Sequence, residues 1–371
     1  MSIIIFVIII TALIFAHELG HFLFAKLFKM RVDEFAIGFP PKIFSWKYGE
    51  TTYSVNLIPF GGFVKIYGEN NEEESIFSGK EPGRSLSFSN QPRKNQILVL
   101  IAGIVFNILF AWMLFSTSLY IGAPTAAGPG ETGKLMISSV ISASPAELSG
   151  LKPGDVITEI DLPNGQAGTA KIITNPTPDD IKNVVAGSNG KSIALQIDRS
   201  GKVIPLNITP TKGISGESKD FAIGIEMVLV TIKKLSLVSS VLQGFQTTIT
   251  SFKDTAIGIY SFLFQAVQAK ANLGQVSGPV GIISIVGDAS RFGFGYLLSF
   301  AAVISLNLAV INLIPFPALD GGRIFIVCIE AIRRKAIKAR TINWINGIGF
   351  LILIIFMIVI TYSDLSRIFG W

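Results

Sequence analysis

The stretch IIIFVIIITALIFAHELGHFLFAKL, residues 3–27, is long and apolar enough to cross a bilayer, yet it contains two histidines and a glutamate. About 20 mainly apolar residues span the roughly 30 Å of hydrocarbon. Ionisable groups are costly at that depth and usually face protein or a water-filled cavity. The stretch lacks the basic start and the cleavage site of a signal peptide. We therefore expect a retained transmembrane helix with a functional polar site inside it.

Three further stretches, at about 97–121, 296–316 and 342–362, have similar length and apolarity. Half of all residues are hydrophobic and only 15% are charged, against roughly a quarter charged in soluble domains. The net charge of +6 does not indicate nucleic-acid binding, because the basic residues are spread along the chain and several flank apolar stretches. The one cysteine, Cys328, excludes an intrachain disulfide. These features predict a polytopic α-helical protein with about four spans in a lipid bilayer.

Basic residues follow the first span, precede the second, and cluster between the third and fourth. Because basic loops stay on the cytoplasmic side, both connections are expected there, and both chain ends outside. The expected domains are an N-terminal membrane half at 1–121, an extracytoplasmic domain at 122–228, an amphipathic membrane-proximal segment at 229–295, and a C-terminal membrane half at 296–371.

The expected outer domain has an α+β pattern. MISSVISASPAELSGLKPGDVITEID, residues 136–161, reads as a strand, a short helix near 145–150, a tight turn and a second strand. The stretch 242–269 carries Phe, Ile and Leu at helical spacing with few charges, which is typical of a helix on a membrane surface. A plain connector near the membrane remains an alternative for this stretch.

His17 and His21 are four residues apart, so a helix places both on one face, where two imidazole nitrogens can reach one ion. Glu18 adjoins the first ligand and is placed to take a proton from water. This is the H-E-x-x-H pattern of zinc metalloproteases. Two histidines hydrogen-bonded to neighbouring helices would be a simpler reading, but that reading does not account for Glu18. We therefore predict a zinc site.

A catalytic zinc ion takes three protein ligands and leaves one position open. The chain has no third histidine, so an acidic residue from another membrane segment is expected. The best candidate is Asp320 in ISLNLAVINLIPFPALDGGR, residues 304–323, just past the third span. Pro315 and Pro317 break the helix there, which is tolerated at this depth where the backbone lines a cavity or is buried in protein. Asp320 could also cap a following cytoplasmic helix.

Several motifs together resemble a known family. They are HELGH at 17–21, NLIPFPALDGG at 312–322, PFGGFVKIYGE at 59–69, IAGIVFNILFA at 101–111 and SGPVGI at 277–282. With the PDZ-like pattern between them, they resemble the bacterial site-2 proteases, and most closely the regulator of sigma-E protease. Members of this family are intramembrane zinc metalloproteases of the bacterial cytoplasmic membrane, with the active site near the cytoplasmic side.

The resemblance implies roles for particular residues. His17, His21 and Asp320 would bind zinc, and Glu18 would be the catalytic acid and base. Asn307 and Asn312 match asparagines that help to bind the substrate segment or support the site. Polar contacts between helices are the alternative role for both asparagines.

The resemblance also implies the partners. The substrates would be single-span membrane proteins whose outer part is already shortened, such as anti-sigma factors or signal-peptide remnants. A membrane-inserted β-loop near residues 50–68 would present a strand edge to an extended substrate. The PDZ-like groove would take a peptide or a chain terminus, although this domain could merely restrict access.

Three other functions compete with this interpretation. A catalytically inactive membrane scaffold that binds peptides through its PDZ-like domain has no need of Glu18. A transporter would be expected to show inverted repeats, and none is evident in the sequence. A metalloprotease with a water-exposed site on a membrane anchor is disfavoured because the motif lies inside the first span.

Overall fold

The computed structural model describes residues 2–69, 86–127, 133–141, 144–161, 172–199, 201–212, 220–268, 270, 276–335 and 337–369. The chain forms two compact units. The first contains Met1–Thr117, Leu237–Gly287 and Leu298–Trp371, and the second contains Ser118–Ser236 and Asp288–Leu297.

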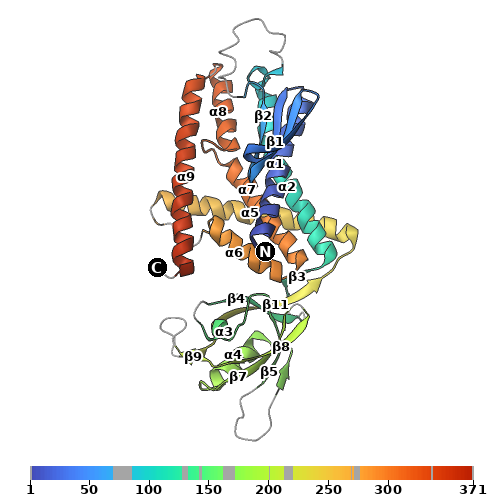
Figure 1. Cartoon of the computed structure of the whole chain (residues 1–371), viewed down its shortest axis with the longest axis vertical. Helices are drawn as coiled ribbons and strands as arrows, with labels where there is room; N and C mark the ends of the chain where they lie inside the picture. The colour runs from blue at the N-terminus through green and yellow to red at the C-terminus, as the bar shows by residue number, and fades with distance from the viewer. Residues whose placement is uncertain are drawn as a thin grey trace. The chain divides into compact units, whose positions relative to one another are not determined.

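Four helices in the described part of the chain are long and apolar enough to cross a membrane. They are α1 (Ser2–Leu27), α2 (Arg93–Ile121), α7 (Phe294–Leu313) and α9 (Ala339–Phe369) (Figure 1). All four are apolar around most of their circumference, as expected of helices that face lipid or a protein core on every side. With the β-sheets inserted between the helices, they confirm the predicted fold class.

Helices α1 and α2 approach each other closely where small residues face one another. A Cβ atom built on Gly20 of α1 would lie only 2.5 Å from the backbone oxygen of Ala102 on α2. Glycine is required at this position because any side chain would push the two backbones apart. The histidines of α1 lie on either side of this contact in the sequence, so the close approach brings them against α2.

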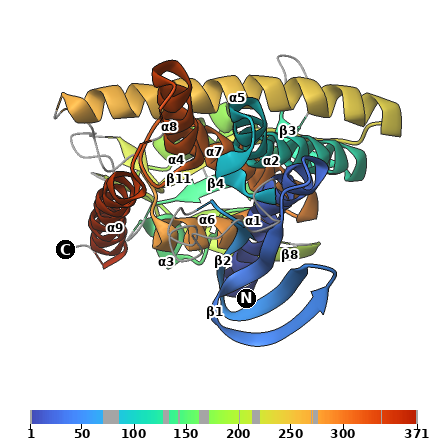
Figure 2. The same ribbon diagram turned by 90° about the horizontal axis from the view of Figure 1, so that it is seen from above.

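Strands β1 (Val32–Tyr48) and β2 (Thr51–Ile66) pair antiparallel in a strongly bent sheet. Residues 34–37 of β1 have partners on both sides, at 62–65 and at 52–55. The sheet lies beside α1 (Figure 2), and Thr11 of α1 donates a hydrogen bond to the backbone oxygen of Pro59 (3.0 Å). The last part of β2 thus runs along the histidine-bearing helix.

Three further helices lie wholly or mainly in the first unit. They are α5 (Leu237–Val267), α6 (Pro279–Arg291) and α8 (Asp320–Arg333). The helix expected at 242–269 is present as α5, which runs across the direction of α9 (Figures 1 and 2). Trp112 of α2 donates a hydrogen bond to the backbone oxygen of Val241 (2.9 Å) and packs on Phe245. Asp364 of α9 accepts a hydrogen bond from the backbone of Gly281 (2.8 Å), at the start of α6.

The second unit is built on one sheet with the strand order β3-β11-β4-β5-β7-β8. A seventh strand, β6 (Ile172–Thr174), pairs with β5. The strands of the main order are β3 (Ala123–Ala126), β11 (Ile225–Lys233), β4 (Lys134–Val140), β5 (Val156–Asp161), β7 (Ile193–Arg199) and β8 (Lys202–Ile208). Two short strands, β9 (Thr211–Lys212) and β10 (Phe221–Ala222), pair with each other.

Helices α3 (Pro145–Leu148) and α4 (Pro178–Gly187) contribute to the core of the second unit. The expected succession of strand, short helix, turn and strand is confirmed as β4, α3 and β5. Helix α4 begins with a capping box, in which Thr177 and Asp180 satisfy each other's backbone N–H groups. Its buried face, which includes Ile181 and Val184, lies in the same apolar cluster as strand residues such as Ile157.

Candidate metal centre

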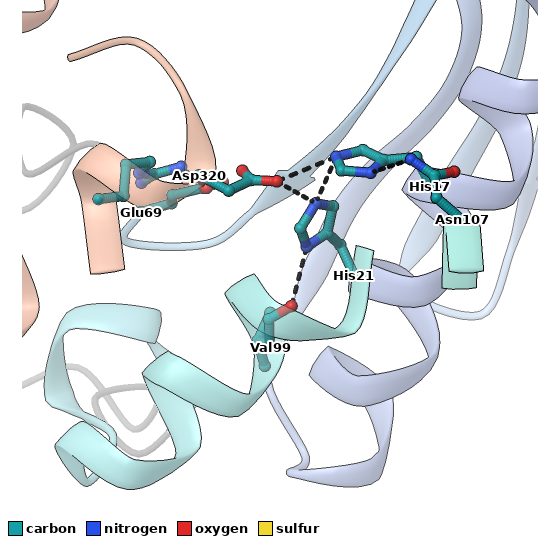
Figure 3. Close-up of polar contacts among 7 residues, drawn as sticks. His17, His21, Glu69, Val99, Asn107 and Asp320 are labelled. Atoms are coloured by element: carbon teal, nitrogen blue, oxygen red, sulfur yellow. Dashed lines mark hydrogen bonds and ion pairs between the residues drawn. The ribbon is translucent and has the colours of Figure 1, made fainter. Parts of the chain in front are cut away.

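Three side-chain atoms from two helices converge on one point. The Nε2 atoms of His17 and His21 are 3.1 Å apart, and Oδ2 of Asp320 lies 3.0 Å from the first and 3.3 Å from the second (Figure 3). A tetrahedral zinc site with bonds of about 2.0–2.1 Å places its ligand atoms about 3.3 Å apart. The observed spacing therefore fits a single zinc ion, and these residues form a possible metal-binding group in the described chain.

The Asp320 carboxylate supports this fit independently. Its Oδ2 atom is buried and makes no hydrogen bond with any described residue, although two imidazole nitrogens lie within 3.3 Å. A buried carboxylate oxygen without a hydrogen bond is unfavourable, and a cation shared with the two imidazole nitrogens removes that cost. Two imidazole nitrogens with one carboxylate oxygen are also a donor set found in catalytic zinc sites.

Helix α8 delivers Asp320 through a tight turn after α7. A Cβ atom on Gly321 would lie 2.3 Å from the backbone oxygen of Ile314, and one on Gly322 would lie 2.1 Å from that of Phe316. Only glycine allows the start of α8 to pack this closely on the turn before it. The Asp-Gly-Gly sequence is therefore the local reason that the carboxylate reaches the histidines.

The alternative prediction that Asp320 caps the following helix is wrong, because Asp320 does not occupy the N-cap position of α8. The cap of α8 is Leu319, no side chain makes a capping hydrogen bond there, and Asp320 is already the first residue of the helix. Its carboxylate is directed at His17 and His21, as Figure 3 shows, and not back at the helix backbone.

A stripe of three residues on α2 surrounds the other side of the histidines. His21 Nδ1 lies 2.9 Å from the backbone oxygen of Val99, and His17 Nδ1 lies 3.1 Å from the side-chain amide of Asn107. Between them, a Cβ atom on Gly103 would lie 2.4 Å from Nε2 of His21. Outer partners of this kind orient metal-binding imidazoles. Both Nδ1 atoms are thus occupied, which leaves the Nε2 atoms facing Asp320.

The sequence indicated only a family resemblance for the segment 101–111, which holds Gly103 and Asn107. It did not predict that these two residues contact the metal ligands. The available signal was their spacing of four residues, which places a glycine and an amide on one face of a very apolar helix. That spacing does not reveal which helix the face contacts.

Glu18 is half-buried on α1, and a Cβ atom on Gly62 of β2 would lie 3.5 Å from its Cγ. The glutamate therefore lies between the histidine-bearing helix and the adjacent sheet. Asn307 is half-buried and Asn312 is buried on α7. The catalytic role of Glu18 and the substrate-binding role of the two asparagines remain predictions.

Ion pairs hold α8 against neighbouring elements. Arg323 pairs with Glu69, which lies three residues after β2, and Arg93 at the start of α2 pairs with Glu330 at 2.9 Å. The Glu330 side chain is only 7% exposed and that of Arg93 is 33% exposed, so this second pair is partly shielded from solvent. Together the two pairs fix both ends of α8 and hence the position of Asp320.

Long apolar helices that carry a zinc centre of two histidines and one aspartate define a membrane zinc metalloprotease. Comparison with known proteins agrees, because the sequence model of the family described as "Peptidase family M50" matches residues 5–356. The chain belongs to peptidase family M50.

The relatives cover essentially the whole chain. A protein of Clostridium perfringens, provisionally named a zinc metalloprotease, is 37% identical over 355 residues, which are 96% of each chain. The zinc metalloprotease RasP of Geobacillus kaustophilus is 29% identical over 440 positions, covering 99% of this chain and 98% of its own. The regulator of sigma-W protease RasP of Bacillus subtilis is 28% identical over 441 positions, covering 99% of each chain. The zinc cofactor and the metalloprotease activity predicted from the sequence are thus confirmed at the level of the family.

Proposed function

We propose that this protein hydrolyses peptide bonds in or near the transmembrane segments of single-span membrane proteins. The observation that carries the proposal is the position of the metal ligands. His17 and His21 lie well inside α1, which is long and apolar enough to cross a membrane. A peptide bond can reach these ligands only at membrane depth, so the natural substrate is a segment that already lies there.

The residues around the metal centre divide the chemistry among them. When bound by His17, His21 and Asp320, zinc supplies a Lewis acid that polarises the scissile carbonyl and lowers the pKa of water. Glu18 takes the proton of the attacking water on its carboxylate and delivers it to the leaving amine nitrogen. Its place beside the first ligand, and against β2, suits this transfer.

The adjacent sheet offers a place for an extended substrate. A helical segment must be unwound before cleavage, and its freed backbone groups can then pair with the edge of a sheet. Residues 62–65 of β2 pair with β1 on one side, and Gly62 lies next to Glu18. A substrate strand added along this part of β2 would pass the catalytic carboxylate, with Asn307 and Asn312 of α7 helping to hold it.

An apolar cavity between α1 and the sheet fits the same substrate class. Its volume is about 250 Å³, and its lining includes Phe15, Leu19 and Phe22 of α1 with Trp46 and Tyr53 of the sheet. Such a lining binds a large apolar side chain, the kind that a transmembrane segment provides.

We place the protein in the bacterial cytoplasmic membrane, with the active site near the cytoplasmic side and the PDZ-like domain outside. The basic residues that flank the spans support this orientation. The PDZ-like domain at 122–228 would bind a peptide or chain terminus, and the segment at 229–295 would lie along the membrane. Three relatives are named RasP, one of them as the regulator of sigma-W protease. The name regulator of sigma-W protease supports a regulatory role for this protein too, and we propose pre-shortened proteins such as anti-sigma factors as its substrates because the motif resemblance implies them.

The Glu18→Gln variant tests the mechanism. Removing a general acid and base costs about 100- to 10,000-fold in rate. We therefore expect Glu18→Gln to bind zinc at the wild-type stoichiometry and to lose cleavage of a single-span reporter by that factor. Both quantities are measured on detergent-purified protein.

Asp254→Asn is the matched control, because Asp254 is exposed on α5, a helix that carries none of the metal ligands. It should cleave at the wild-type rate. Undiminished cleavage by Glu18→Gln would remove Glu18 from the mechanism. Absence of cleavage by the wild-type protein itself, with zinc bound, would favour the inactive scaffold.

A further inference from the structure

Asn107 is the outer partner of His17, and its amide group is incompletely paired. The residue is fully buried on α2. Its Nδ2 atom lies 3.1 Å from Nδ1 of His17, while its Oδ1 atom is buried and has no hydrogen-bond partner among the described residues. Buried amide oxygens are almost always paired, so this arrangement requires an explanation.

His21 shows that a metal-binding imidazole needs a hydrogen-bond acceptor at the ring nitrogen that does not bind the metal. Its Nδ1 atom faces the backbone oxygen of Val99, and a carbonyl oxygen can only accept a hydrogen bond. The proton of a neutral His21 ring is therefore on Nδ1, and the lone pair on Nε2 is free for a metal. The backbone of α2 fixes this tautomer.

The contact of Asn107 through Nδ2 imposes the opposite tautomer on His17. If Nδ2 donates to Nδ1 of His17, the proton of the neutral ring is on Nε2, and Nε2 then lacks the lone pair that zinc requires. The oxygen and nitrogen of a side-chain amide have nearly the same shape, so their assignment follows from the hydrogen-bond network. Exchanging them places an acceptor where His17 needs one.

We propose that Asn107 is the positioning residue of the metal centre: its Oδ1 atom accepts the Nδ1 proton of His17 and so directs the lone pair of Nε2 to zinc. The exchange gives the otherwise unpaired amide oxygen a donor. It also gives His17 the same kind of partner that Val99 gives His21. Asn107 touches no reacting atom, so it acts through His17 and not on the substrate.

The surroundings hold this amide in place. Ser305 of α7 donates a hydrogen bond to the backbone oxygen of Asn107 (2.8 Å). One turn earlier, Gly103 leaves the space that the two rings occupy. Since the residue is anchored through its backbone and enclosed by helices, its amide can adjust mainly by turning about its own axis.

Zinc affinity separates this role from plain packing between helices. Loss of an outer partner typically weakens metal binding about 10- to 100-fold. We expect that loss for Asn107→Leu, which keeps the side-chain size but has no acceptor. Asn107→Asp has only acceptor oxygens, so it should bind zinc as tightly as the wild type. Affinity is measured by competition with a chromophoric chelator in detergent.

Asn56→Leu is the matched control. Asn56 is also buried with an Oδ1 atom that has no partner among the described residues, but it donates to the backbone oxygen of Gly38 in the β1–β2 sheet. Its substitution should leave zinc affinity unchanged. Unchanged affinity in Asn107→Leu, or equal weakening in Asn107→Leu and Asn107→Asp, would overturn the proposal.

Nitrogen NMR of the wild-type protein reports the tautomer directly, so this test does not depend on whether a variant folds. Because the chain has only two histidines, ¹⁵N-histidine labelling gives spectra of His17 and His21 alone. The zinc-loaded wild type should show both rings protonated at Nδ1, and Asn107→Leu should shift one Nδ1 resonance and leave the other. An unprotonated Nδ1 in the zinc-loaded wild type would overturn the proposal.

This inference rests on the metal centre of the proposed function but not on proteolysis. Zinc affinity and the ¹⁵N spectra are measured without any substrate. If the proposed substrates were not cleaved, the zinc affinities and the spectra would still test the role of Asn107. If the Asn107 proposal were wrong, the cleavage assay would still test the proposed function.

Discussion

At the scale of single residues, the site depends on atoms whose pairing is incomplete without a cation. Asp320 carries a buried oxygen with no hydrogen bond to the described residues, and two imidazole nitrogens lie within 3.3 Å of it. In a membrane interior such a group is unfavourable by itself. Its position is therefore best understood as that of a metal ligand.

Asp320→Asn tests this assignment with almost no change in shape. The amide loses the negative charge that binds the cation, so zinc affinity should fall by more than the roughly 100-fold that loss of an outer partner can cost. Metal analysis of the purified variant measures the effect. Asp33→Asn, at a surface pair with Arg31, should keep full zinc content. If Asp320→Asn kept its zinc as well, another acidic residue would have to be the third ligand.

At the scale of elements, the centre depends on how closely α1 and α2 approach. Gly20 of α1 faces the backbone of Ala102, and Gly103 of α2 faces the imidazole of His21. Both glycines remove side chains where two helices and two rings share one space. The small residues of α2 thus decide that Val99 and Asn107 can reach the ligands at all.

Gly103→Ala should disturb the metal centre although alanine favours a helix. In a helix interior alanine is preferred over glycine by about 1 kcal/mol. However, the added Cβ would lie 2.4 Å from Nε2 of His21, so the ring must move. We expect weaker zinc binding, measured by the same chelator competition.

Gly347 of α9 provides the comparison for this substitution. No atom lies within 4 Å of a Cβ built there, so Gly347→Ala should change helix stability alone and leave zinc affinity at the wild-type value. Equal zinc affinity in the two variants would show that the α1–α2 contact is looser than described.

At the scale of the whole molecule, the metal centre and the core of the inserted β-rich domain belong to different compact units. His17, His21 and Asp320 all belong to the first unit. The second unit has an apolar core of its own, which includes Leu135, Ile157 and residues of α4. We therefore expect that one unit can unfold locally while the other stays folded, as cooperative folding units within one chain do.

Asp155→Ala should destabilise the second unit alone. The Asp155 side chain is 1% exposed and pairs with Arg199 at 2.7 Å, in the turn before β5. Removing one partner of a buried pair costs about 3–5 kcal/mol, and less here because Arg199 is 31% exposed. Limited proteolysis should cut within residues 118–236 sooner than in the wild type, while zinc content stays unchanged. Simultaneous loss of zinc would contradict the independence of the two units.

Much of this architecture could be predicted because it depends on local sequence. The four spans follow from uninterrupted apolar runs, whose length alone matches a bilayer. The shared face of His17 and His21 follows from helical spacing, and the α3 turn follows from its Ser, Pro and Gly residues. Asp320 was predicted by elimination and by resemblance, since the sequence contains no other histidine.

The remaining features could not be predicted because they depend on which surfaces meet. An apolar helix gives no sequence signal for the face that contacts a neighbour, so the Val99, Gly103 and Asn107 stripe was missed. The partners of residues 34–37 on both sides of β1 depend on how far the sheet bends. The pairing of Arg323 with Glu69 joins groups 254 residues apart, which local patterns do not reveal.

The sequence by itself determined the kind of protein: apolar length set the spans, and the spacing of two histidines set the metal site. Only the tertiary structure decided which atoms complete that site. Metal ligation and tautomer choice depend on distances of about 3 Å between different helices, and such distances arise from packing and not from the order of residues along the chain.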